Sequence, residues 1–244
     1  MRNSIKLYLK KFLWRFPFLN NLISLFLKKV SKDDRRFRRS LEELFEGKTY
    51  SFVQVGSNDG KTNDPIYKFA TLQNWKGVAI EPVQSPFERL KKNYRNFTNV
   101  TPKQFVVGPK GVVQFYFVKN EAKEELKGLP PWWDQLGSCD ISHIESHLDG
   151  MFSKYIGQIE LEAVPLNNIV EEHLNGKIDL LHVDAEGFDD VVIETLDLSR
   201  FTPKVIIFEH QHLSADRLEN LCKKLSLFRY SLQKFSYDML CIRR

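Results

Sequence analysis

The chain has 244 residues, of which 42% are hydrophobic and 13% aromatic, and its formal net charge is +5. This length supports one domain with a sizeable core. The three scattered cysteines, without CxxC spacing, exclude a disulfide framework or structural zinc and indicate a reducing compartment. No apolar run approaches the ~18 residues of a transmembrane helix.

The positive charge is concentrated in the first forty residues. Residues 1–40 hold twelve Lys and Arg against Asp33 and Asp34, whereas residues 41–244 carry a net charge of −5. An enzyme acting on nucleic acid usually spreads positive charge around its catalytic face, so we expect no nucleic-acid partner. We predict a basic arm over residues 1–40 and a catalytic domain over residues 41–244.

The arm places leucine and phenylalanine beside lysine and arginine, and Pro17 divides it into two short helical pieces. This pattern suits a helix lying on anionic lipid. The arm has no signal-peptide cleavage pattern, so we expect a cytoplasmic protein that binds peripherally at the inner membrane face. The alternative is an arm that packs on the domain or on a second subunit.

The most informative stretch is Ser51–Gly60, in which an apolar strand, 52–55, runs into a turn with Gly56 and Gly60. Asp64-Pro65 then predicts a helix start, and together these segments predict a nucleotide-binding βαβ unit. The G-x-x-x-G spacing lacks the glycines that a pyrophosphate needs, which argues against a nicotinamide oxidoreductase. S-adenosylmethionine has no phosphate, and its sulfonium cation suits such a turn.

A second strand, 78–81, ends in Glu81, twenty-five residues after Gly56. In a βαβ unit this position lies beside the cofactor ribose, where a carboxylate accepts both sugar hydroxyls. The alternative, a solvated glutamate, is less favoured at this spacing.

The remaining pattern alternates helices and strands and ends in two neighbouring strands. Predicted helices cover 86–94, 166–174, 189–196 and 215–225; predicted strands cover 103–107, 112–118, 159–164, 178–183, 204–209, 228–235 and 239–243. We expect 103–107 and 112–118 to form a hairpin, and the aperiodic stretch 119–160 to form a functional lid. The fold class is therefore α/β, with a doubly wound, mostly parallel sheet and an antiparallel C-terminal hairpin.

Carboxylates follow the strand 178–183, at the sheet edge where ligands bind. Methyl transfer to a hydroxyl requires loss of its proton, to a carboxylate or His, or a metal that lowers its pKa. Asp184 is our candidate for this role and the only candidate metal ligand; whether a divalent metal takes part stays open. Alternatively, Asp184 caps a helix starting near Phe188. Glu186 is a second catalytic candidate, with a solvated side chain as the alternative.

Five histidines are candidate site residues. His210 and His212 alternate along an extended segment and so face opposite sides; we favour His210 as base or substrate contact, with a hydrogen-bonded surface residue as the alternative. His182 lies within an apolar strand and is expected in the core. His143 and His147 could share a helix face, but without a third ligand we expect them to be solvated.

Three motifs together resemble the FkbM-type family of S-adenosylmethionine-dependent O-methyltransferases, over about residues 50–214. They are Phe52–Gly60, Ala79–Pro82 and Ile178–Gly187, and Phe208-Glu209-His210 continues the match. The resemblance implies a Rossmann-like class I methyltransferase fold, S-adenosylmethionine as cofactor, and O-methylation of sugars or natural products.

The resemblance also implies the cofactor residues. It points to Gly56, Ser57, Asp59, Gly60 and Glu81, and puts Asp184 at the reacting end. The full predicted cofactor set, read from the strand ends, is Gln54, Gly56, Ser57, Asn58, Asp59, Gly60, Glu81, Pro82 and Val107. Gln54 departs from the acidic residue that methyltransferases commonly carry there, which weakens a carboxylate contact to the methionine amino group.

The leading hypothesis is a methyltransferase acting on a sugar hydroxyl of a small or lipid-linked acceptor. Two alternatives remain: an RNA or protein methyltransferase, and a catalytically silent methyltransferase fold that serves as a membrane-bound scaffold.

Overall fold

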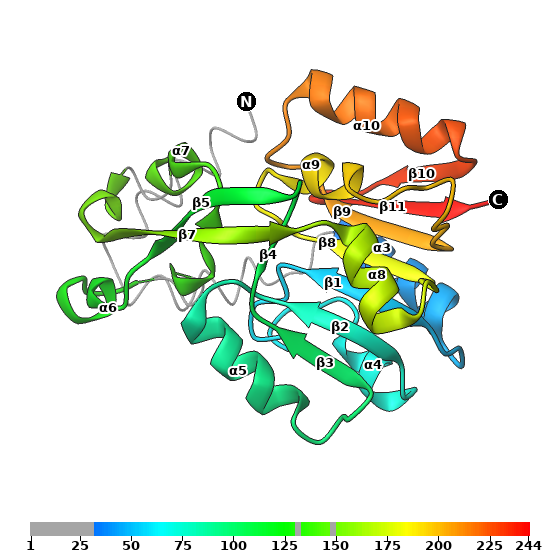
Figure 1. Cartoon of the computed structure of the whole chain (residues 1–244), viewed down its shortest axis with the longest axis horizontal. Coiled ribbons are helices and arrows are strands. Elements are labelled where there is room, and N and C mark those ends of the chain that lie inside the picture. Colours follow the sequence, from blue (N-terminus) through cyan, green and yellow to red (C-terminus); the bar gives the residue numbers. More distant parts are fainter. Residues whose placement is uncertain (1–31, 130–132, 147–149) are drawn as a thin grey trace.

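The computed structural model describes residues 32–129, 133–146 and 150–244. Figure 1 shows a central sheet with helices on both faces and a smaller second sheet to one side. The two helical pieces predicted in the arm lie within residues 1–31 and so outside the described residues. Among the described helices, none is long and apolar enough to cross a membrane.

Seven strands form the central sheet in the order β10-β11-β9-β8-β1-β2-β3. Their bounds are Ser51–Val55 for β1, Lys76–Ile80 for β2, Val100–Lys103 for β3, Leu180–Val183 for β8, Val205–Glu209 for β9, Tyr230–Lys234 for β10 and Asp238–Arg243 for β11. β11 pairs antiparallel with both β9 and β10, whereas β3, β2, β1, β8 and β9 run parallel. The predicted doubly wound sheet with a C-terminal hairpin is confirmed. Chain order reverses between β1 and β8, where such sheets bind ligands.

Helices cover both faces of this sheet. One layer comprises α3 (Lys32–Phe45), α4 (Tyr67–Leu72) and α5 (Gln84–Tyr94); the other comprises α8 (Leu166–Leu174), α9 (Asp189–Glu194) and α10 (Ala215–Leu227). Alternate strand residues face the two layers, so that Phe52 packs with the first three helices and Val53 with the last three. The core is thus split into two clusters by the sheet.

The predicted boundary at residue 40 falls within α3. Phe37, Leu41 and Phe45 are spaced four residues apart and all are buried against the domain. The Arg36 guanidinium lies over the Phe235 ring and donates to the Lys234 carbonyl at 2.9 Å. The last nine residues of the basic arm therefore pack on the domain through a helix that continues into it.

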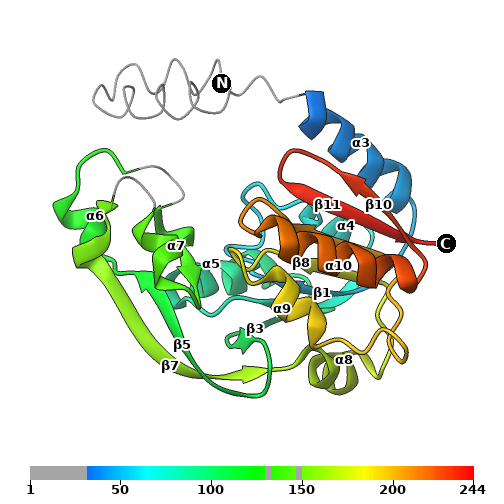
Figure 2. The same ribbon diagram turned by 90° about the horizontal axis from the view of Figure 1, so that it is seen from above.

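The described residues between 106 and 164 form a lobe beside the central sheet. Its second sheet has the order β4-β7-β5-β6, with β4 at Val106–Val107, β5 at Gly111–Val118, β6 at Gly137–Ser138 and β7 at Ile156–Val164. The lobe also holds α6 (Glu121–Glu125), α7 (Ile141–Glu145) and the 3-10 turns η1 (Trp133–Gln135) and η3 (Ser153–Tyr155). Both views show β5 and β7 reaching away from the main body, with α6 and α7 at the far end (Figures 1 and 2).

Two strand predictions in this region are wrong. The predicted strand 103–107 divides into β3 and β4, which belong to different sheets, and β5 pairs antiparallel with β7 rather than with the segment before it. The β5–β7 register runs from Gly111 opposite Ala163 to Val118 opposite Ile156. Alternation identified both strands, but it carries no information about the partner when a long segment separates them.

Candidate functional site

The turn after β1 is pressed against the end of β8. Gly56 has φ +72°, and a Cβ there would lie 1.8 Å from the Asp184 carbonyl oxygen. Only glycine permits this approach. Ser57 fixes the turn to β2: its N–H donates to the Ile80 carbonyl at 2.9 Å, and its Oγ accepts from the Ile80 N–H at 3.0 Å. The first two strand tips therefore form one rigid unit.

Glu81 lies directly after β2 and is only 6% exposed. Its Oε2 accepts from the Asn58 N–H at 2.9 Å and its Oε1 from the Val83 N–H at 2.8 Å. Burial raises the pKa of Glu81 to about 7 despite these two hydrogen bonds. Each oxygen keeps a further lone pair, so the carboxylate can accept hydrogen bonds from two adjacent hydroxyls.

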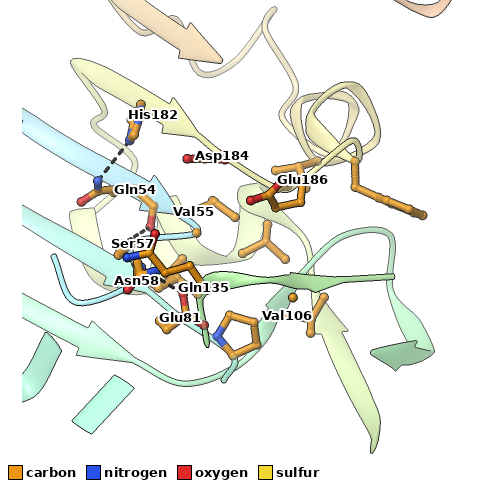
Figure 3. A pocket seen from close by; sticks show the side chains of 18 of the residues that line it. Gln54, Val55, Ser57, Asn58, Glu81, Val106, Gln135, His182, Asp184 and Glu186 are labelled. Carbon is orange, nitrogen blue, oxygen red and sulfur yellow. Dashed lines mark hydrogen bonds between the residues drawn. The ribbon is translucent and has the colours of Figure 1, made fainter. Parts of the chain in front are cut away.

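A pocket opens at these strand tips (Figure 3). Seven of the nine predicted cofactor residues line it: Gln54, Gly56, Ser57, Asn58, Glu81, Pro82 and Val107. Asp184 and Glu186 line it too, so the structure brings both halves of the sequence pattern together. Phe105 and Phe115 add apolar wall on the side of Val107.

Asp59 and Gly60 shape the turn from outside the pocket lining. The Asp59 carboxylate accepts from the N–H groups of Lys61 and Thr62 at 2.9 and 2.7 Å, and these hydrogen bonds keep its pKa low although burial opposes them. A Cβ at Gly60 would lie 2.3 Å from Leu90. Both residues shape the turn, and neither is among the residues that line this pocket.

The pocket wall is acidic. Asp64, Glu81, Asp184 and Glu186 line it, and none of the described residues lining it is Lys or Arg. The ionised forms of these carboxyl groups attract a cation and repel a pyrophosphate. The pocket therefore suits a positively charged ligand with sugar hydroxyls.

Gln54 is held by hydrogen bonds along the pocket wall. Its Nε2 donates to Asp64 Oδ2 at 2.7 Å and lies 3.1 Å from His182 Nδ1. Burial lowers the pKa of His182 to about 4, so the ring is neutral and Nδ1 can accept. His182 is thus a satisfied core residue, as predicted. Gln54 Oε1 is buried and has no hydrogen-bond partner in the part of the chain that the structure describes, so it can accept from a ligand.

Asp184 follows β8 directly, and its N–H donates to the Val55 carbonyl at 3.0 Å. It does not cap a helix, because α9 begins at Asp189 with Phe188 as N-cap and no side-chain cap bond. Asp184 keeps solvent access through the pocket. Desolvation by the surrounding protein atoms raises the pKa of Asp184 above its usual range, and the negative charges of Glu209 and Glu186 raise it further. The group is positioned to accept a proton.

The structure does not bring His210 into the pocket. His210 is buried, and its Nε2 lies 2.9 Å from the Phe235 carbonyl oxygen. His212 faces the site instead: its Nε2 lies 3.6 Å from Glu186 Oε2. As predicted, only one of the two histidines faces the site. It is His212 and not His210, because a turn at 211–213 places His212 over Gly187.

His143 is not solvated as predicted. Its side chain is 8% exposed, and its Nε2 lies 2.8 Å from Glu186 Oε2. The rings of His143 and His212 meet edge to face, with centroids 4.6 Å apart. The predicted partner at i+4, His147, lies outside the described residues. Sequence reasoning missed this cluster because its third member comes from the far end of the chain.

The stretch 119–160, which we expected to be functional, supplies three pocket residues that the sequence did not single out: Gln135, Gly137 and Cys139. Burial raises the pKa of the Cys139 thiol to about 11, so it is protonated at neutral pH. No periodic signal marks residues 133–139, which explains why they were missed.

Comparison with known proteins gives a family. The model of the methyltransferase FkbM domain matches residues 54–232. No curated protein matches the chain in sequence.

Solved structures with a related arrangement include three methyltransferase or RNA-processing proteins. An FkbM methyltransferase from Methylobacillus flagellatus KT has a TM-score of 0.49 and 13% identity, covering 79% of this chain and 43% of its own. Precorrin-6y C5,15-methyltransferase from Geobacter metallireducens GS-15 has a TM-score of 0.43 and 13% identity, and the match covers 89% of this chain and 91% of its own. The fibrillarin pre-rRNA processing protein of Methanococcus jannaschii has a TM-score of 0.41 and 12% identity, and the match covers 80% of this chain and 66% of its own.

The chain thus spans less than half the length of the FkbM structure. The family model, in contrast, matches nearly three quarters of this chain and includes the glycine turn, Glu81 and Asp184. The resemblance that the motifs predicted is confirmed: the chain belongs to the FkbM methyltransferase family.

Proposed function

We propose that this chain is an S-adenosylmethionine-dependent O-methyltransferase that methylates a hydroxyl of a sugar in a glycan, glycolipid or natural-product pathway. The observation that carries the proposal is Glu81, a buried carboxylate at the tip of β2 in a pocket whose wall is acidic. Family membership supports the methyltransferase activity.

The residues present fit S-adenosylmethionine. Glu81 would accept from the ribose hydroxyls, and the tight approach of Gly56 to Asp184 holds the turn against the end of β8. The orphaned Gln54 Oε1 would accept from the ammonium group, a role that an amide oxygen fills as a neutral acceptor. The bound cofactor supplies an activated methyl group on a sulfonium.

The transfer has a simple balance. The cofactor would supply the methyl group, with the electron pair of the broken carbon–sulfur bond remaining on sulfur, and an oxygen lone pair of the acceptor would form the new carbon–oxygen bond. The hydroxyl proton goes to a base, for which Asp184 at the end of β8 is our candidate. Glu186, across the same pocket, would orient the acceptor through its hydroxyls.

The side chains around Asp184 and Glu186 favour a sugar as the acceptor. Asp184 and Glu186, two residues apart on the loop after β8, offer four carboxylate oxygens, a pattern that suits a polyhydroxylated molecule, and Gln135 adds an amide oxygen elsewhere on the pocket lining. An anionic acceptor would meet repulsion here. We also propose that the part of the basic arm before α3, residues 1–31, associates with anionic membrane at the inner face, near lipid-linked precursors. Co-sedimentation with anionic vesicles, with and without residues 1–31, tests that part; equal sedimentation rejects it.

Calorimetric titration of the full chain with S-adenosylmethionine tests the function. Wild type should bind, and Glu81→Gln should lower the affinity by about 10- to 100-fold, because hydrogen bonds to a charged group contribute about 1.5–3 kcal/mol. Glu88→Gln is the matched control: Glu88 is exposed on α5 and should leave affinity unchanged. Absence of binding by wild type would overturn the proposal and favour the silent scaffold.

A further inference from the structure

Three potential metal ligands converge at the mouth of the pocket from three separate parts of the chain. His143 comes from α7 in the lobe, Glu186 from the loop between β8 and α9, and His212 from the loop after β9. One ligand atom of each lies within 4.8 Å of the others. No pair of these residues is adjacent in sequence, so the fold itself brings them together.

The spacing suits a small cation. Two ligands bound at about 2.1 Å in tetrahedral geometry lie about 3.4 Å apart. Glu186 Oε2 lies 3.6 Å from His212 Nε2 and 2.8 Å from His143 Nε2. The second distance is that of a hydrogen bond, and a shift of less than about 1 Å would convert it to a ligand–ligand separation. No backbone rearrangement is required.

The loop that carries Glu186 is fixed from both sides. Ser138 Oγ donates to the Glu186 carbonyl at 3.3 Å from the lobe, and Arg217 donates to the Gly187 carbonyl at 2.9 Å from α10. Glu186 itself has φ +49°, a left-handed conformation that a glutamate adopts only when its surroundings hold it there. Such preorganisation is typical of metal ligands that neighbouring residues hold in place by hydrogen bonds.

The donor set indicates the class of cation. Two imidazole nitrogens and one carboxylate suit first-row transition ions such as Zn²⁺, whereas Mg²⁺ and Ca²⁺ prefer oxygen ligands. Three protein ligands leave a coordination position open, as in catalytic rather than structural zinc sites. Of the three residues, Glu186 lines the pocket, so the site lies beside the end proposed for the acceptor.

We propose that His143, Glu186 and His212 form a binding site for one transition-metal dication of the Zn²⁺ class. Its location beside the acceptor rests on the function proposed above. There, such a cation would bind the acceptor hydroxyl and lower its pKa, and it would also tie the lobe to the main body, because one ligand comes from α7 and two from the central sheet's loops.

Calorimetric titration of the metal-stripped full chain with ZnCl₂ tests the site directly. Wild type should bind one Zn²⁺ per chain, and His143→Ala, Glu186→Gln and His212→Ala should each weaken binding by more than about 100-fold, since even second-shell losses cost 10- to 100-fold. His173→Ala, a histidine on α8 outside the cluster, should bind as wild type does.

Co²⁺ provides a second readout. The visible spectrum of the Co²⁺ protein should show ligand-field bands without thiolate-to-metal charge transfer, which separates this site from binding at Cys139. Zn²⁺ affinity that is equal in wild type and the three variants, or a thiolate spectrum, overturns the proposal and leaves the cluster as an acid–base group.

The metal titration and the cofactor titration test two separate proposals, and either result can be negative without the other. Zn²⁺ binding without S-adenosylmethionine binding upholds the site and rejects the proposed function. Binding of S-adenosylmethionine alone upholds the function and rejects the metal site.

Discussion

The two ends of the pocket, named here after the cofactor and the acceptor that we propose they bind, are built in different ways. At the cofactor end, Ser57, Asn58 and Glu81 are joined by hydrogen bonds across neighbouring parallel strands, and the contributing residues lie within one βαβ unit. At the acceptor end, His143, Glu186 and His212 come from the lobe and from two loops on the other side of the switch point.

This difference shows that one end of the pocket depends on the path of the backbone and the other on individual side chains. The cofactor end is set by backbone geometry, because the Gly56 turn and the end of β8 touch directly. The acceptor end is set by side chains on a lobe that meets the main body at a limited number of contacts. Substitutions at the first end should therefore affect folding and cofactor binding, whereas those at the second should affect the acceptor.

The largest expected effect is that of Gly56→Ala. The new Cβ would meet the Asp184 carbonyl oxygen at 1.8 Å, and neither backbone segment can move without breaking the sheet. We expect the free energy of unfolding to fall by more than about 4 kcal/mol, measured by chemical denaturation.

Gly47→Ala is the matched control, because Gly47 has φ +69° with nothing within 4 Å of the added Cβ. It should cost only the left-handed strain of about 1–2 kcal/mol. Equal losses in the two variants would mean that the turn is not held rigidly against β8.

The next effect is a pH dependence of cofactor affinity at Glu81. Burial raises its pKa to about 7, and the ionised form accepts hydroxyl hydrogen bonds better. Affinity for S-adenosylmethionine should therefore rise about tenfold between pH 6 and pH 8, and Glu81→Gln should remove this rise. A pH-independent affinity in wild type would argue against ribose contact at Glu81.

The same pKa has a consequence for stability with the opposite sign. Glu81 ionises in the unfolded chain near its usual pKa of 4.5 but in the folded chain only near 7. The free energy of unfolding should thus decline as pH rises from about 4.5 to about 7, because the unfolded chain loses its proton first. Glu81→Gln should flatten this decline in thermal melts over that range.

The smallest expected effect concerns the link between the lobe and α5. Arg89 Nη1 lies 2.8 Å from Asp134 Oδ2, and both side chains are partly buried. Arg89→Ala should lower stability by less than about 1 kcal/mol and speed proteolysis within the lobe by a few-fold.

Cofactor affinity, measured at pH 8, should be unchanged in Arg89→Ala. Lys91→Ala, which removes an exposed ion pair on the same helix, should leave proteolysis as in wild type. A loss of cofactor affinity in Arg89→Ala would show that the two ends of the pocket are not independent.

The sequence predicted the arrangement of the β1 and β2 strand tips well because its signals are local. A strand, a glycine turn and a carboxylate twenty-five residues later lie in one continuous unit, and Glu81 lies where that unit places it. α8 is found at Leu166–Leu174 as predicted, since its apolar spacing and the Asn175-Gly176 stop are also local.

The acceptor end could not be predicted in this way. The choice between His210 and His212 depends on a turn with no clear residue signal, and His143 gains its role only from residues more than forty positions away. The pairing of β5 with β7 likewise spans the whole aperiodic stretch, so neither periodicity nor turn chemistry could identify it.

The lobe enters and leaves the main body at one place, because β4 and the end of β7 are paired neighbours, Val106 opposite Ala163 and Val107 opposite Val164. An insertion with adjacent ends can change in length or sequence without altering the strand order of the sheet that carries it. Evolution can therefore exchange this module while the donor-binding half stays intact, and an engineer can graft a different lobe between β4 and α8 to redirect which acceptor is modified.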